Sequence, residues 1–129
     1  MKYLLAIIVL ITSLSASELK WNNSYEQALS EAKSLNKDVY MLVTSSNCKW
    51  CRKFERTTLQ DDSVIKRLKE QYVLLHIDRD KDYMPKKFKK KRVPRHYFIT
   101  SNGGIIYSFL GYWNSEDFFS FLKDVDERR

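Results

Sequence analysis

The sequence predicts an α/β protein in which a mixed central β-sheet of about four strands has helices on both faces. Two apolar, β-prone runs, at 38–45 and 72–77, are separated by helical segments. Strands joined through helices pair in parallel. Two further runs, at 94–100 and 105–110, flank the turn sequence SNGG, which indicates an antiparallel hairpin. The sheet is therefore expected to contain both kinds of pairing.

Longer helices are expected at the two ends of this pattern. The first runs from Ser24 to about Leu35, with apolar residues at helical spacing and Asn23 as the candidate N-cap. The last begins at the candidate cap Ser115 and carries an apolar stripe that reaches Val125.

Shorter elements fill the middle of the chain. A helix is expected over 52–59, and a second one follows the capping residues 61–63. After the strand at 72–77, residues 84–92 are expected to form a short helix or an ordered loop. Residues 18–23 form a lead-in segment before the first helix.

Both cysteines of the chain lie in the stretch TSSNCKWCRKFE, at 44–55. Cys48 and Cys51 are three positions apart, where a strand passes into a helix. Free backbone N–H groups and the helix dipole favour a thiolate at the first position. Cys51, one turn further in, is placed to attack a mixed disulfide formed on Cys48. This spacing predicts that Cys48 attacks a substrate and Cys51 releases it.

Neighbouring side chains are expected to adjust this chemistry. Lys49 and Arg52 place positive charge near Cys48 and are expected to lower the pKa of its thiol. Trp50 lies between the cysteines, where it covers the site or offers an apolar contact to a partner chain.

The motif CKWC after a hydrophobic strand, the segment VPRHYF, the SNGG turn and a Gly before the closing helix together resemble the thioredoxin superfamily. They most resemble its exported single-domain members, over about residues 24–125. The resemblance implies a thioredoxin-like fold and a cis peptide bond between Val93 and Pro94 that faces the cysteines. It also implies that the Val93 backbone pairs with an extended substrate. With Trp50, these two residues form the expected substrate-binding set, and the Cys48–Cys51 disulfide is expected to work without a cofactor.

This chain departs from the family pattern behind the cysteines. Members often carry a buried Asp six positions before the first cysteine as a proton acceptor, and that position is Leu42 here. A Lys common on the next strand falls at Leu74, and the Trp that usually precedes the first cysteine is Asn47. We therefore expect Glu55 or a water molecule to accept the proton of Cys51.

A zinc site is the main alternative for the cysteine pair. Structural zinc needs four ligands, and the sequence offers only His76 and His96 besides the thiols. Their spacing matches no zinc-finger pattern, so no metal is expected. His76 is expected in a core or edge position with its ring paired, and His96 is expected to be structural.

The formal net charge is +7 at pH 7, and six of the seven residues at 86–92 are Lys or Arg. This run is expected to form a solvated face that Phe88 ties to the core. The alternative is that it steers an acidic partner or an anionic membrane surface to the protein. Nucleic acid is not expected as a partner of an exported protein.

The first 17 residues have the composition of a secretory signal peptide. Lys2 precedes an apolar run at 4–11, and small residues follow. The run is shorter than the roughly 20 residues that span a bilayer, although an uncleaved anchor is the alternative. We expect a signal peptide at 1–17 and a thioredoxin-like domain at 18–129, in the periplasm or secreted.

The sequence thus predicts a periplasmic thiol:disulfide oxidoreductase, more a reductant of exported proteins than an oxidant. No His neighbours Cys48 to stabilise its reduced form. The partners are protein thiols or disulfides and an upstream redox protein, and the chain is expected to be a monomer. The alternative is a non-catalytic binding module of the same fold that holds an extended or acidic partner.

Overall fold

The computed structural model describes residues 18–89 and 92–129. The expected signal peptide at 1–17 and residues 90–91 of the basic run lie outside the described residues. The helices and strands follow one another as β1 (Trp21–Asn22), α1 (Tyr25–Leu35), β2 (Asp38–Thr44), α2 (Lys49–Arg56), α3 (Asp62–Gln71), β3 (Tyr72–Asp78), β4 (Arg95–Ile99), β5 (Ile105–Leu110) and α4 (Ser115–Glu127). Single 3₁₀ turns lie at Thr58–Gln60 and Lys86–Phe88.

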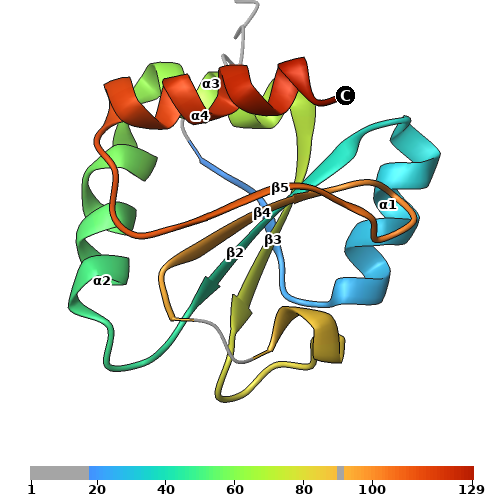
Figure 1. The fold of residues 1–129 in the computed structure, drawn as a ribbon, viewed down its shortest axis with the longest axis horizontal. Helices are drawn as coiled ribbons and strands as arrows, with labels where there is room; N and C mark the ends of the chain where they lie inside the picture. The colour runs from blue at the N-terminus through green and yellow to red at the C-terminus, as the bar shows by residue number, and fades with distance from the viewer. Residues whose placement is uncertain (1–17, 90–91) are drawn as a thin grey trace, which may run out of the picture.

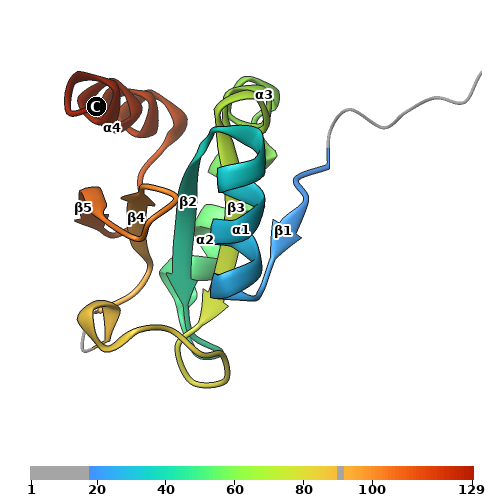
Figure 2. The ribbon, with the colours of Figure 1, turned by 90° about the vertical axis from the view of Figure 1, so that its right-hand side faces the viewer.

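The strands form one mixed sheet in the order β1-β3-β2-β4-β5 (Figure 2). The neighbours β1, β3 and β2 are parallel, whereas β4 is antiparallel to both β2 and β5. Figure 1 shows α1 on one side of the strands and α2 on the other. The predicted mixed sheet with helices on both faces is confirmed.

In the described part of the chain the sheet has five strands, whereas about four were expected. The additional strand is β1, in which Trp21 and Asn22 pair with Leu74 and Leu75 of β3. Two residues are too few to show a period-2 pattern, so this part of the chain looked like a lead-in segment.

The inner strands bury both faces because their side chains alternate between two cores. In β2, Val39, Met41 and Val43 belong to the core under α1, while Tyr40 and Leu42 belong to the core under the other helices. This two-sided burial explains why the strand is an uninterrupted apolar run in the sequence.

The helix ends differ from the predictions by a few residues. The N-cap of α1 is Ser24, whose side chain accepts from the Gln27 N–H, and not Asn23. Asn114 caps α4, so Ser115 is its first helical residue. The helix expected over 52–59 begins earlier, at Lys49, because Cys48 serves as its N-cap.

Phe88 of the basic run is buried, as expected, and it packs against Tyr25 and Tyr97. The described part of the run around it forms a 3₁₀ turn with exposed lysines. The prediction that Phe88 ties this segment to the core is confirmed.

His96 points into the core under α2 and α4, where it is fully buried. Its ring stacks on Phe109 and meets the edge of Phe54. Nε2 lies 2.8 Å from the Gly111 carbonyl, which only accepts, so Nε2 carries the hydrogen. Nδ1 then accepts from the Tyr40 hydroxyl at 2.6 Å. Both ring nitrogens are satisfied in the neutral form, in line with the structural role expected for His96.

Burial lowers the pKa of His96 from 6.5 to about 4. As the pH falls below 6.5, the unfolded chain takes up this proton before the folded chain does. The contribution of His96 to the free energy of unfolding is therefore fully present above pH 6.5 and falls by about 3 kcal/mol down to pH 4. Denaturant titrations at several pH values measure this loss.

The double variant Tyr40→Phe/His96→Phe removes the titrating ring without leaving a buried hydroxyl unpaired. Between pH 7 and pH 4, the free energy of unfolding of this variant should decrease by about 3 kcal/mol less than the free energy of unfolding of the parent does. Equal pH dependence in the two proteins would contradict the assignment to His96.

Candidate active site

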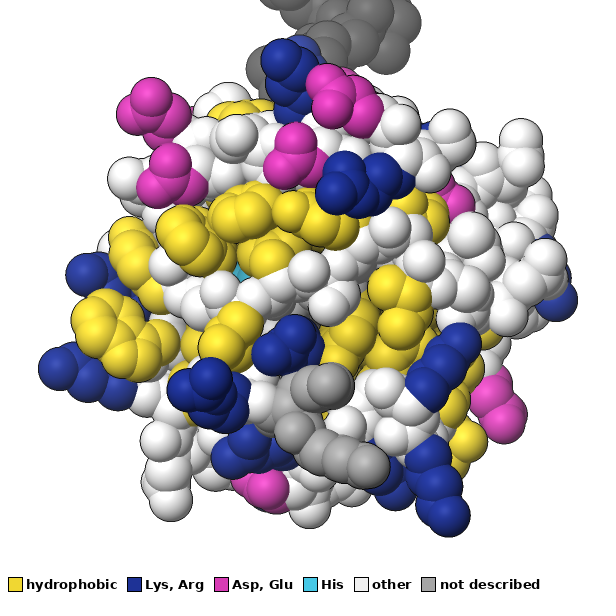
Figure 3. Space-filling model, in the orientation of Figure 1, with side chains coloured by type: hydrophobic (Ala, Val, Ile, Leu, Met, Phe, Trp, Pro, Cys, Tyr) yellow, Lys and Arg dark blue, Asp and Glu magenta, His cyan; other side chains and the backbone are white. Residues whose placement is uncertain are grey.

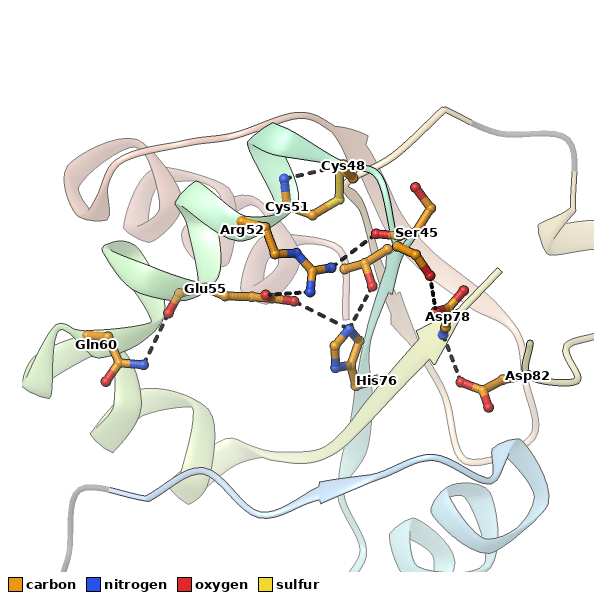
Figure 4. Close-up of polar contacts among 11 residues, drawn as sticks. Ser45, Cys48, Cys51, Arg52, Glu55, Gln60, His76, Asp78 and Asp82 are labelled. Carbon is orange, nitrogen blue, oxygen red and sulfur yellow. Dashed lines mark hydrogen bonds and ion pairs between the residues drawn. A yellow bond between two sulfur atoms is a disulfide. The ribbon is translucent and has the colours of Figure 1, made fainter. Parts of the chain in front are cut away.

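Cys48 and Cys51 form a disulfide where β2 passes through a short loop into α2. Cys48 is the N-cap of α2, and its Sγ accepts from the Cys51 N–H at 3.1 Å (Figure 4). Cys48 is partly exposed, whereas Cys51 is fully buried. A reactant from solution therefore has access to Cys48 and not to Cys51.

The loop that carries Cys48 is held from two sides. The Arg52 Nη2 donates to the Ser45 carbonyl at 3.1 Å (Figure 4). The Ser46 hydroxyl donates to Asp78 at 3.3 Å. The first contact ties the loop to α2 and the second ties it to the end of β3. Cys48 is thus fixed relative to both elements.

The Val93–Pro94 peptide bond is cis. The Pro94 carbonyl accepts from the Gly111 N–H at 2.7 Å, which holds the segment before β4 against the end of β5. The Gly111 carbonyl in turn accepts from His96. The segments at 93–94 and 110–112 therefore form one connected wall beside α2.

The three expected substrate-binding residues are brought together in one cavity. Its volume is about 450 Å³, and its lining is mostly apolar. It is lined by Trp50, Arg92, Val93, Pro94, Leu110, Gly111 and Tyr112. Trp50 is 51% exposed, so it is available to a partner.

A second cavity, of about 390 Å³, lies on the other side of Trp50 and includes Cys48 itself. It is lined by Ser45, Asn47, Cys48, Lys49, Trp50, Arg79, Arg92 and Val93. The two cavities share Trp50, Arg92 and Val93, so they adjoin each other beside Cys48, and we treat them together as one binding region. We call it the Cys48 groove.

Trp50 and Tyr112 form an aromatic pair in this groove, with ring centroids 6.1 Å apart. The Lys53 ammonium lies 4.6 Å from the Tyr112 centroid and 5.3 Å from that of Trp50. Lys49 lies 5.6 Å from the Trp50 centroid. These cation–π contacts hold positive charge at the aromatic pair.

Arg52 and Glu55, both expected to adjust the chemistry, form an ion pair along α2 at 3.3 Å. Glu55 also lies 3.6 Å from Nε2 of His76 on β3, and the same nitrogen lies 2.8 Å from the Thr44 hydroxyl on β2. Figure 4 shows this cluster between α2 and the sheet. These residues connect the helix of the cysteines to the two central strands.

The partner of Leu42 on β3 is His76. The parallel register joins Asp38 to Tyr72, which places Leu74 beside Tyr40. An imidazole therefore stands next to the position where the family often has its buried acid.

A polar cavity of about 440 Å³ opens beside this cluster and is lined by Leu42, Arg52, Glu55, His76 and neighbours from 18–21 and 59–60. Two buried atoms of the cluster, Glu55 Oε1 and Arg52 Nε, have no hydrogen-bond partner among the described residues. The cavity offers room for water beside them.

Burial lowers the pKa of His76 from 6.5, while the Glu55 charge acts in the opposite direction and the Arg52 charge adds to the lowering. The ring is therefore neutral at pH 7.

Sequence reasoning missed His76, Arg92 and Tyr112 as members of the site. Arg92 directly precedes Val93, and Tyr112 follows the Gly before the last helix, so both are next to motif positions. Arg92 ends the basic run at 86–92, which the sequence did not connect to the cysteines, and Tyr112 belongs to no motif. Only the fold brings both residues to Trp50.

Within 18–89 and 92–129, no three His, Cys, Asp or Glu side chains are grouped to hold a metal ion. In the same part of the chain, every helix is too short or too polar to cross a membrane.

A family model described as a thioredoxin-like domain matches residues 25–126. Among curated proteins, spermatogenesis-associated protein 20 of Mus musculus is 28% identical over 60 residues. The matched part is 46% of this chain and 8% of that protein. The chain thus covers a small fraction of the curated relatives that it matches.

Solved structures share the fold over most of their length. The structure named DsbH oxidoreductase has a TM-score of 0.71 and 22% identity, and the match covers 91% of this chain and 90% of that one. A putative disulphide-isomerase from Bacteroides thetaiotaomicron has a TM-score of 0.74 and 21% identity, with 87% and 94% covered.

Two substitutions should move the titration of His76 in opposite directions. Glu55→Gln removes a charge that favours the imidazolium, so the pKa of His76 should fall further. Arg52→Gln removes a charge that disfavours it, so the pKa should rise. NMR titration of the imidazole protons measures both shifts.

The buried ring of His96 is an internal control in the same spectra, because neither Glu55 nor Arg52 is among the causes of its shift. Shifts of His76 with the same sign in both variants would contradict the arrangement of the cluster.

Proposed function

This chain belongs to the thioredoxin-like family, and from that premise we propose that it is a thiol:disulfide oxidoreductase that works through Cys48 and Cys51. The observation that carries the proposal is the asymmetry of the pair. Cys48 is partly exposed at the start of α2 and opens into a groove, while Cys51 is buried one turn further in. Such a pair has one thiol for the substrate and one for its release.

In the reducing direction, the Cys48 thiolate attacks one sulfur of a substrate disulfide. A mixed disulfide forms and the other substrate sulfur leaves as a thiolate. Cys51 loses its proton to water or to Glu55 and attacks the Cys48 sulfur. The Cys48–Cys51 bond forms and the second substrate sulfur leaves, so two electrons have passed from the protein to the substrate. An upstream dithiol restores the reduced pair.

The N-terminus of α2 supports the first step. The Cys51 N–H is directed at the Cys48 sulfur at 3.1 Å, and it would stabilise a thiolate there. The two cavities beside Cys48 offer room for a substrate segment, and Val93, which lines both, is the residue whose backbone we propose pairs with it.

We further propose that the protein is an exported monomer that reduces disulfides of other exported proteins. The support for export is the signal-like sequence at 1–17. The support for the reducing direction is the residue pair Lys49-Trp50 between the cysteines, which supplies no imidazole to stabilise the reduced form.

Substitution of the two cysteines should have different effects. Cys48→Ser should abolish the reduction of insulin disulfides, because no other exposed thiol can start the exchange. Cys51→Ala should keep the first step and accumulate mixed disulfides on Cys48, which mass spectrometry of trapped complexes detects. Full insulin reduction by Cys48→Ser would show that the mechanism is wrong.

A non-catalytic binding module is the second candidate, and it is favoured by Leu42 at the position of the usual buried acid. Equilibration with glutathione separates the two functions. A reductant should exchange its disulfide and have a potential below about −200 mV, towards the thioredoxin value of about −270 mV. A disulfide that never exchanges with glutathione would support the binding module, and a potential near −120 mV would support an oxidant.

A further inference from the structure

The Cys48 groove differs in character on its two sides. On one side of Trp50 the lining is apolar and includes Pro94, Leu110 and Tyr112. On the other side it is mixed and includes the polar side chains of Asn47 and Lys49 beside the cysteine itself. In Figure 3, hydrophobic side chains over α2 and the segment before β4 are bordered by Lys and Arg side chains. A chain lying along the groove would meet both environments.

The charge of the groove is of one sign. Neither cavity lining contains an Asp or a Glu. Arg79 also lines the groove, and it forms an ion pair with Asp80 at 3.8 Å. In the described part of the chain, no carboxylate forms an ion pair with Lys49, Lys53 or Arg92. Their charge is therefore available to a partner.

These cations are held close to the point of reaction. Lys49 and Lys53 lie over the Trp50 ring, and Arg92 lines both cavities on the opposite wall. A carboxylate placed near Cys48 would have positive charge on both sides. Charges at this range and in a partly enclosed groove attract each other more strongly than they do in open water.

The apolar side of the groove is complementary to a different kind of substrate group, an apolar side chain. Trp50, Tyr112, Leu110 and Pro94 surround a space of about 450 Å³, which is large enough for an aromatic or branched aliphatic side chain. Trp50 is half exposed, and burying it under such a side chain would add to the affinity.

We propose that this site selects an extended protein segment in which the reacting cysteine has Asp or Glu on one side and a large apolar residue on the other. This inference rests on the proposed function, since the reaction is the disulfide exchange already described. It adds the class of substrate: acidic segments with an apolar anchor.

The test uses the full chain and four peptides that share one internal disulfide. Their flanks are Glu with Phe, Gln with Phe, Lys with Phe, and Glu with Ala. The second-order rate constant for reduction of each peptide is measured at low and at high salt. The Glu–Phe peptide should react about tenfold faster than the Lys–Phe peptide at low salt, and the difference should shrink at high salt. Replacing Phe with Ala should slow the reaction by about threefold or more.

Matched variants separate the effect of the groove cations from the effect of the net positive charge of the protein. Lys53→Gln/Arg92→Gln and Lys66→Gln/Lys123→Gln each remove two positive charges, but only the first pair lies at the groove: Arg92 lines both cavities, and Lys53 lies over the rings of the lining residues Trp50 and Tyr112. The ratio of rates for the Glu–Phe and Gln–Phe peptides should fall towards one in the first variant. It should stay at the parent value in the second.

Equal rates for all four peptides would overturn the inference and leave the proposed function standing. An equal loss of the ratio in both double variants would also overturn it, because the preference would then come from net charge. If the parent reduces neither the peptides nor insulin, the proposed function itself fails.

Discussion

The backbone of Gly111 is held from two sides. Its N–H donates to the Pro94 carbonyl at 2.7 Å, and its carbonyl accepts from the His96 ring at 2.8 Å. The φ angle of 110° at this residue lies in the left-handed region, which only glycine adopts without strain. Through these contacts the aromatic core determines where the wall of the Cys48 groove stands relative to the cysteines. A neutral imidazole is essential to this arrangement, since its Nδ1 accepts from Tyr40 while its Nε2 donates to Gly111.

The second constraint is the burial of β2 and β3 on both faces. Each strand supplies alternate side chains to the two cores, so neither strand can shift by one residue without exposing one set and crowding the other. The fixed register sets the neighbours at the ends of the strands. It brings Leu42 beside His76 and Thr44 beside Asp78, directly before the loop that leads to Cys48.

Behind the cysteines, Arg52, Glu55 and His76 form a polar cluster, and His76 is the strand neighbour of Leu42. Arg52 forms an ion pair with Glu55 and donates to the Ser45 carbonyl. Its side chain therefore links the loop before Cys48 to the carboxylate of the cluster. His76 lies against the same carboxylate from the strand side. The Glu55 and Arg52 charges act on the pKa of His76 in opposite directions, so the loss of either side chain would move the pKa of that imidazole. The cavity at its side gives water access to these groups.

The sequence by itself determined the elements and the reactive pair. Apolar runs, turn residues and caps are short-range signals, and they predicted the strands at 38–44 and 72–78 to within a residue, the hairpin around 101–104 and the position of Cys48 before a helix. Tertiary structure alone decided which side chains meet. The two-residue strand β1, the pairing of Leu42 with His76, and the meeting of Trp50 with Tyr112 join parts of the chain that lie far apart. Such contacts depend on strand register and on the packing of whole elements. No periodic pattern in the local sequence encodes these contacts, because they result from the packing of the two cores on the sheet.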